Sequence, residues 1–227
     1  MEWFVYIGTK KMKLFDIFPC PIFGTQYPEH QCLKKKVLEI VETHIDDFEE
    51  NISSKNLLHF KNRLDQSILY DPIFSDFKIW LEDMCYNYIT SLLGYELPDK
   101  VIVTDSWLNK CNAGGEQMAH YHSNSFVSGT YYLNFDPEKH SPIMFNKKST
   151  LSHPHQPSIS LLQKEDFITK YNSDSIVYPE EGEVYLWESH MSHSVPKNLA
   201  DNRITLSMNF MPTVVSNSRY GFKVRYT

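Results

Sequence analysis

The sequence has no long apolar run, and no window in it comes near the roughly 20 apolar residues that a membrane helix needs. Its N-terminal stretch also lacks the apolar segment and the small-residue cleavage site of a secretory signal. These two absences predict a cytoplasmic protein without a membrane partner.

Cysteine and basic charge are scarce as well. The 227 residues include 4 cysteines without a CxxC pair, which indicates free thiols in a reducing compartment. Lys and Arg number 22 against 28 Asp and Glu, a formal net charge of -6. This balance argues against nucleic-acid binding through a broad basic surface. The lysine cluster at 34–36 is interpreted as a solvated helix face.

What the chain does have is apolar and aromatic residues, at 41% and 14% of the sequence. The length suits one domain, 1–227, with a substantial core. Helical spacing of apolar residues predicts helices over Glu29–Glu50 and Asp76–Leu93, and the aromatic stripe of the second is expected to pack on a sheet. The polar segment Asn51–Ser67 between them is expected to be a loop, with a short helix within it as an alternative. Residues 1–98 are thus predicted to be mostly helical support.

Residues 99–227 follow a two-residue period, which is typical of strands. The expected strands are Val101–Val103 continuing through Trp107–Asn109, Phe126–Phe135, Pro142–Phe145, Ser175–Tyr178, Glu183–Trp187, Ile204–Met211 and Gly221–Tyr226. This series predicts a mainly β fold with flanking helices and a double-stranded β-helix core, a cupin-like jelly roll. The irregular stretch His140–Lys170 has the length of a lid or substrate loop.

Three histidines are candidate metal ligands. His120 and His122 are two residues apart, so in a strand they would point to the same face. His193 follows about 70 residues later, at the end of another expected strand. Neutral imidazole suits iron, zinc, copper and nickel, and three protein ligands leave coordination positions open. We therefore predict a metal site of His120, His122 and His193.

Arg203 comes ten residues after His193, in the next expected strand. A guanidinium deeper in the barrel can hold a carboxylate with two parallel hydrogen bonds and stays charged at any working pH. Thr205, two residues on, faces the same way and can add a hydroxyl. The pair predicts a binding site for an acid, such as 2-oxoglutarate, whose other end chelates the metal.

Other side chains compete for these roles or surround them. His190 lies three residues before His193 and is an alternative ligand, although the sequence after His193 favours His193. His153 and His155 are interpreted as loop residues. Trp107, Tyr131 and Trp187 are candidates for the pocket wall, with core packing expected for Trp107.

The sequence resembles the 2-oxoglutarate- and iron(II)-dependent oxygenase superfamily, and more narrowly a branch found in bacteria and marine bacteriophages. The resemblance runs from about Lys13 to about Phe210 and rests on three blocks together. They are the opening Leu14–Phe23; the central Trp107–Asn109, Gly115, His120–His122, Asn124–Ser125 and Ser128–Leu133; and the closing Gly182, Trp187, His193–Pro196, Arg203–Thr205, Ser207 and Asn209.

The resemblance implies His120 and His193 as iron ligands and Arg203 as the anchor for 2-oxoglutarate. Tyr132 is similar to the tyrosine that prolyl hydroxylases of the superfamily direct at the same carboxylate. The departure is at His122, where the superfamily has HxD or HxE. Three-histidine iron sites occur in cupin dioxygenases, so the change is compatible with oxygen chemistry.

The resemblance therefore implies a dioxygenase that uses iron(II), 2-oxoglutarate and O2 to hydroxylate a protein side chain or a small molecule, releasing succinate and CO2. It also implies the host cytoplasm as the location if the chain is encoded by a phage. Two alternatives stay open: a three-histidine iron dioxygenase that does not use 2-oxoglutarate, and a non-enzymatic cupin-like binding protein.

Overall fold

The computed structural model describes residues 2–7, 10–15, 20–50, 54–60, 67–146, 174–217 and 219–226. Within these ranges the helices are α1 (His30–Thr43) and α2 (Ser75–Asn87), and α2 continues into a π-helical turn over Tyr88–Leu92. Short 3₁₀ segments lie at Ile45–Asp47, Ile68–Tyr70 and Pro72–Phe74. None of these helices has the length and apolar character needed to cross a bilayer.

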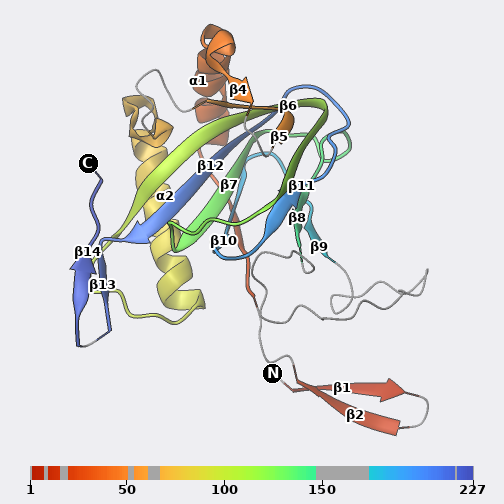
Figure 1. Cartoon of the computed structure of the whole chain (residues 1–227), viewed down its shortest axis with the longest axis vertical. Coiled ribbons are helices and arrows are strands. Elements are labelled where there is room, and N and C mark those ends of the chain that lie inside the picture. The colour runs from red at the N-terminus through yellow and green to blue at the C-terminus, as the bar shows by residue number, and fades with distance from the viewer. Residues whose placement is uncertain are drawn as a thin grey trace.

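Most of the strands belong to one curled antiparallel sheet. The strands are β1 (Glu2–Ile7), β2 (Lys10–Phe15), β3 (Phe23–Gln26), β4 (Glu49–Glu50), β5 (Ser54–Phe60), β6 (Val101–His120), β7 (Val127–Asn134), β8 (Ile143–Phe145), β9 (Ser175–Val177), β10 (Glu183–Glu188), β11 (His193–Val195), β12 (Arg203–Pro212), β13 (Val214–Ser216) and β14 (Gly221–Lys223). The sheet runs β3-β10-β7-β12-β6-β11-β8-β9, with β5 also beside β6 and β4 beside β5 (Figure 1). β1 pairs with β2, and β13 with β14.

The long strand β6 connects the two walls of the barrel. Its first part, Val101–Cys111, pairs with β12, and its last part, Gln117–His120, pairs with β11. Between them the register against β5 shifts, and Gly114 has a positive φ of 78°. Glycine adopts this conformation without the steric cost that a side chain would bring. The bend lets one part of the curled sheet face the other part, so the predicted jelly-roll core with flanking helices is confirmed.

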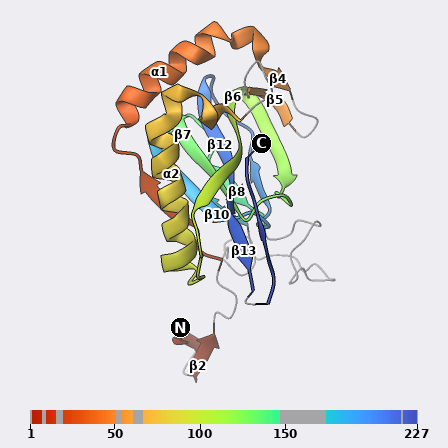
Figure 2. The same cartoon turned by 90° about the vertical axis from the view of Figure 1, so that its left-hand side faces the viewer.

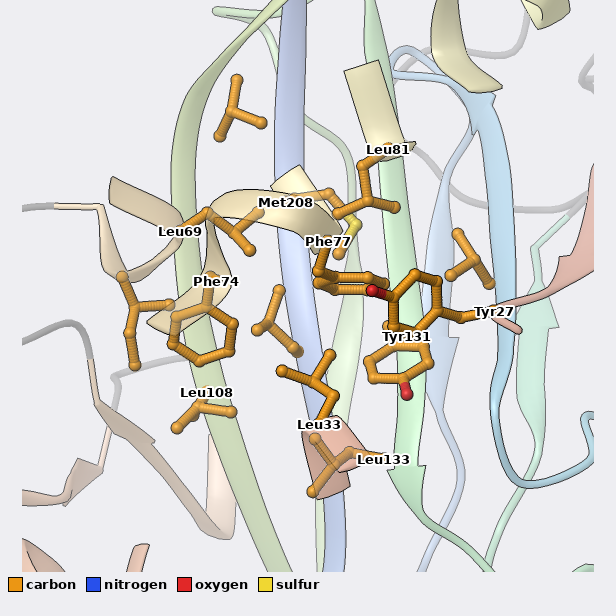
Figure 3. Close-up of a cluster of buried hydrophobic side chains, with 14 of the residues drawn as sticks. Tyr27, Leu33, Leu69, Phe74, Phe77, Leu81, Leu108, Tyr131, Leu133 and Met208 are labelled. Atoms are coloured by element: carbon orange, nitrogen blue, oxygen red, sulfur yellow. The ribbon is translucent and has the colours of Figure 1, made fainter. Parts of the chain in front are cut away.

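Both helices pack against one face of this sheet, as Figure 2 shows. Figure 3 shows Phe77 and Leu81 of α2 and Leu33 of α1 meeting Tyr131 and other side chains of the sheet. The expected aromatic stripe of α2 therefore packs in the core. Leu92, in the π-helical turn that follows α2, is half exposed. The helical face of the sheet is the main hydrophobic core of the described residues.

The opposite face of the sheet carries the polar side chains of β12, and the sequence of that strand shows why. Arg-Ile-Thr-Leu-Ser-Met-Asn-Phe alternates polar and apolar residues from position 203 to 210. Successive side chains of a strand point to opposite faces. The apolar set, Ile204, Leu206, Met208 and Phe210, lies in the helix-side core. The polar set therefore points into the barrel, where the site lies.

Several predicted element boundaries were wrong. The predicted loop Asn51–Ser67 contains strand β5, whose Leu57 and Phe60 are buried. The first helix ends at Thr43 rather than at Glu50. β6 is far longer than predicted because its bend keeps both parts paired. Of the predicted loop His140–Lys170, residues 147–170 lie outside the described residues.

A pair of substitutions in α2 tests the packing of this helix. Phe77 is 1% exposed and Ile79, two residues away, is 58% exposed. We expect Phe77→Ala to lower the free energy of unfolding by about 3–5 kcal/mol, because it removes a buried ring and leaves a cavity. Ile79→Ala should change it by less than about 0.5 kcal/mol. Urea denaturation measures both, and equal losses would contradict the assigned face of the helix.

Candidate metal centre and its pocket

His120 and His193 face each other across two paired strands. They are register partners, because β11 runs antiparallel to the end of β6, and their ring centroids are 4.3 Å apart. The Nδ1 atom of each ring lies against a backbone carbonyl two residues earlier, Met118 at 2.9 Å and Met191 at 3.0 Å. A carbonyl only accepts, so each Nδ1–H donates, and each Nε2 keeps its lone pair. That lone pair is what a metal needs.

His122 joins these two from the segment after β6. Its ring centroid lies 5.3 Å from that of His120 and 5.4 Å from that of His193. Because β6 ends at His120, strand alternation does not place His122, as the sequence had suggested. Instead its backbone N–H donates to the carbonyl of Ser189 at 3.0 Å, which ties the segment to the turn after β10. One nitrogen from each of the three rings lies within 4.8 Å of the others.

Burial keeps these imidazoles neutral. Desolvation lowers the pKa of His120 and brings that of His122 to about 4. His193, 6% exposed, has a pKa well below its usual range, because burial is reinforced by the neighbouring His120. Neutral imidazoles in mutual contact are an arrangement that fits a divalent transition metal.

Arg203 lies in the same pocket and has no anionic partner in the part of the chain that the structure describes. Its side chain is 2% exposed, and its Nε–H donates to the carbonyl of Ser141 at 3.1 Å. Its guanidinium carbon lies 5.6 Å from the ring centre of Tyr132. Burial lowers the pKa of Arg203, but a guanidinium remains charged. A buried cation without a counter-charge is costly, which favours an anion as its ligand.

Two hydrogen-bond donors beside Arg203 and the histidines lack a partner. The hydroxyl of Tyr132 and the indole N–H of Trp187 are buried and make no hydrogen bond to the described residues. Burial next to apolar groups raises the pKa of Tyr132 to about 12, so the phenol stays protonated and can donate. Native proteins rarely bury polar groups unpaired, so these donors indicate a ligand with acceptor oxygens.

All the predicted site residues meet in one pocket inside the barrel. Its lining combines the three histidines and Arg203 with hydroxyls, amides and apolar walls, and among the described residues no Asp or Glu contributes to it. The lining residues are Leu57, Trp107, Asn109, Gln117, His120, His122, Gly129, Thr130, Tyr132, Ile143, Trp187, His193, Val195, Arg203, Thr205, Ser207 and Met208. Thr205, as predicted, faces the pocket beside Arg203.

The other candidates are distributed differently. Trp107 lines the pocket, 5.9 Å from the ring of His122, instead of packing in the core. Tyr131 does not wall the pocket: it lies on the helix face, where its hydroxyl bonds to Nδ1 of His30. His190 is exposed and outside the histidine cluster. His153 and His155 lie outside the described residues.

Sequence reasoning missed the polar residues that support the site. Asn109 donates to Ser207 at 2.9 Å and to Thr205 at 3.3 Å. Asn209 contacts His122 at 3.5 Å. The signal for Ser207 and Asn209 was present in the alternation of β12, because every second residue after Arg203 must face the pocket.

Comparison with known proteins identifies a family that matches the segment containing most of this pocket. Residues 105–209 match the family described as "Putative 2OG-Fe(II) oxygenase". This segment contains all three histidines, Tyr132, Arg203 and Thr205. The expected resemblance to the 2-oxoglutarate- and iron(II)-dependent oxygenase superfamily is therefore confirmed over these residues. A search among curated proteins gives no match.

Solved structures share the fold at low sequence identity. A prolyl-4-hydroxylase from Pseudomonas putida has a TM-score of 0.56 and 13% identity, over 85% of this chain and 92% of that one. HygX from Streptomyces hygroscopicus, with nickel, 2-oxoglutarate and hygromycin B bound, has a TM-score of 0.51 and 12% identity, over 86% of this chain and 84% of that one. A Trichoplax adhaerens prolyl hydroxylase in complex with a peptide fragment has a TM-score of 0.51 and 11% identity, over 84% of this chain and 83% of that one.

The three histidines should make the stability of the metal-free protein depend on pH. Their pKa values in the fold lie below 6.5, the value for an unfolded chain, and that of His122 is about 4. Between about pH 4 and 6.5 the unfolded chain therefore binds more protons, and the free energy of unfolding rises with pH. We expect the stability of chelator-treated protein to fall as the pH drops from about 7 to 4.

His122→Gln should reduce this loss, because one of the titrating groups is removed. Urea titrations of both proteins at several pH values measure the difference. An identical pH dependence in the variant would contradict the buried, neutral state of His122.

Proposed function

We propose that this protein is a 2-oxoglutarate- and iron(II)-dependent dioxygenase that hydroxylates its substrate. In this proposal His120, His122 and His193 hold iron(II), and Arg203, Thr205 and Tyr132 hold the far carboxylate of 2-oxoglutarate. The observation that carries the proposal is the buried Arg203, which has no anionic partner among the described residues and shares a pocket with three neutral histidines. One half of the pocket suits a cation and the other half an anion.

The residues present fit both groups. Three imidazole nitrogens would hold iron(II) and leave coordination positions free for a chelating 2-oxo acid and for oxygen. The guanidinium of Arg203 can hold a carboxylate through two parallel hydrogen bonds. The unpaired hydroxyl of Tyr132 supplies a further donor next to it. The pocket has no acidic lining residue among those described, so nothing in it repels a dianion.

The protein would contribute binding, orientation and exclusion of water. Bound iron(II) with 2-oxoglutarate supplies the oxidation chemistry, in which one atom of O2 enters the hydroxylated substrate and the other enters succinate as CO2 leaves. Arg203 and Tyr132 fix one end of the cosubstrate, so its 2-oxo acid end points to the histidines. The apolar side chains of Ile143, Trp187 and Val195 limit the access of water to the site.

The substrate is proposed to be a protein side chain or a small molecule. Both classes occur among the structures that share the fold, as a peptide on the Trichoplax hydroxylase and hygromycin B on HygX. We further propose one domain over 1–227 and a location in the cytoplasm, or in the host cytoplasm if the chain is encoded by a phage. The bacterial and bacteriophage branch stays a prediction.

One observation favours a second candidate function. His122 stands where the superfamily has a carboxylate, and an all-histidine site occurs in iron dioxygenases that do not use 2-oxoglutarate. Arg203 would then bind a carboxylate of the substrate itself. The two functions differ in whether 2-oxoglutarate is consumed.

Turnover of 2-oxoglutarate separates them. With iron(II) and O2 we expect the protein to convert 2-oxoglutarate to succinate, even slowly without its substrate. His193→Ala should reduce the rate to background, because a ligand is lost, whereas His190→Ala should leave it unchanged because that side chain is exposed and outside the cluster. Iron-dependent oxygen uptake at the same rate with and without 2-oxoglutarate would support the second function. A protein that binds neither iron nor 2-oxoglutarate would be a non-enzymatic binding protein.

Two adjacent tyrosines provide a matched test of cosubstrate binding. Tyr132 faces the pocket and Tyr131 faces the helices. We expect Tyr132→Phe to weaken 2-oxoglutarate binding by about 10- to 150-fold, because a hydrogen bond to a charged group contributes about 1.5–3 kcal/mol. Tyr131→Phe should leave this affinity unchanged. Anaerobic titration of the iron(II)-loaded proteins measures both, and equal effects would contradict the proposed role of Tyr132.

A further inference from the structure

A chain of buried polar side chains lies behind His122. Nδ2 of Asn209 lies 3.5 Å from Nδ1 of His122, and Oδ1 of Asn209 accepts the hydroxyl of Ser128 at 2.8 Å. Ser128 contacts Ser189 at 2.8 Å, and Ser189 contacts Ser125 at 2.8 Å. Asn209 is 3% exposed, and Ser128 and Ser189 are each 1% exposed. These hydrogen bonds therefore link His122 through β12 and β7 to Ser189, in the turn after β10, and to Ser125, in the segment before β7.

His122 depends on this chain in a way that His120 and His193 do not. Those two rings donate Nδ1–H to backbone carbonyls, which fixes their tautomers through the fold itself. At Nδ1 of His122 the structure places a side-chain amide instead. An amide has both an acceptor and a donor, so its orientation decides which nitrogen of His122 carries the proton.

The two orientations of the amide have different consequences. If Nδ2 of Asn209 donates to Nδ1, the proton of the neutral ring lies on Nε2, which then cannot bind a metal. If the amide is turned by half a rotation, Oδ1 accepts Nδ1–H and Nε2 keeps its lone pair. The heavy-atom positions are the same in both cases, so the hydrogen bonds of the neighbouring groups distinguish the two orientations.

The serine hydroxyls allow the second orientation. In the Ser128–Ser189 and Ser189–Ser125 contacts either hydroxyl can be the donor. Nδ2 of Asn209 can therefore donate one N–H to Ser128, Ser128 can donate to Ser189, and Ser189 can donate to Ser125. Ser189 also accepts the backbone N–H of His122, so the same residue holds the backbone of His122 and its side-chain partner.

We propose that Asn209 is a positioning residue that makes His122 a metal ligand, by accepting its Nδ1–H and directing Nε2 to the metal. This inference rests on the proposed metal site and adds the reason that a histidine can replace a carboxylate there. A carboxylate binds a metal with either oxygen and has no tautomer to select. An imidazole needs a partner at its second nitrogen, and Asn209 is that partner.

The test is the affinity of the metal-free protein for cobalt(II), measured by competition with a chelator. Asn209→Leu keeps the size of the side chain and removes the acceptor. We expect a 10- to 100-fold weaker affinity, which is about the cost of losing the partner of a ligating histidine. Asn209→Asp places an acceptor beside Nδ1 of His122 and has no donor there. This variant should therefore bind cobalt(II) at least as tightly as the wild type. If Asn209→Leu does not fold, Asn209→Asp still tests the direction of the hydrogen bond.

Two controls exclude a general structural effect. Asn198 is also buried, 1% exposed, and its amide bonds backbone groups away from the histidines. Asn198→Ala should lower the unfolding temperature without changing cobalt affinity. In a His122→Ala background, Asn209→Leu should cause no further loss of affinity, because its partner is already absent.

The outcomes separate this inference from the proposed function. A wild type that binds no metal would overturn both. A wild type that binds cobalt while Asn209→Leu binds within twofold of it would overturn the role of Asn209 alone. A loss that persists in the His122→Ala background would do the same. Weak binding by Asn209→Asp would show that the amide donates to His122, and would overturn the proposed orientation.

Discussion

The strict two-residue alternation along β12 is the constraint on which the rest of the structure depends. Its apolar residues build the core under α1 and α2, and its polar residues build the pocket wall. A slip of one residue in the pairing of β12 would exchange the two sets. It would place Arg203 against the helices and Ile204 in the pocket. The core under the helices therefore fixes which face of β12 lines the pocket, because a slip of one residue would remove Leu206 and Phe210 from that core.

Burial has opposite effects on the two halves of the pocket. It lowers the pKa of the histidines, so they stay neutral and are ready to share lone pairs with a cation. It leaves Arg203 charged and without a nearby carboxylate among the described residues, so that half favours an anion. A single molecule with a chelating end and a distant carboxylate satisfies both demands. For this reason the argument for 2-oxoglutarate depends more on Arg203 than on the metal ligands.

Periodicity in the sequence was sufficient to predict the jelly roll, both helices and most of the strands after residue 98, because their apolar residues follow the period of the element that buries them. It failed at β5, whose polar composition resembles a loop, and which is a strand because β6 lies beside it. It also failed to separate Tyr131 from Tyr132. Adjacent residues of a strand cannot both face one pocket, so assigning Tyr132 to the site should have excluded Tyr131.

The position of His122 is determined by a tertiary contact and not by the local sequence pattern. Spacing of two residues suggested that one strand presents His120 and His122 together, but β6 ends at His120. His122 reaches the cluster because Ser189, in a turn far along the chain, accepts its backbone N–H. A residue placed by a turn rather than by a ladder has more freedom of orientation. It therefore needs a side-chain partner, and Asn209 lies within 3.5 Å because the alternation of β12 continues past Arg203 to that position.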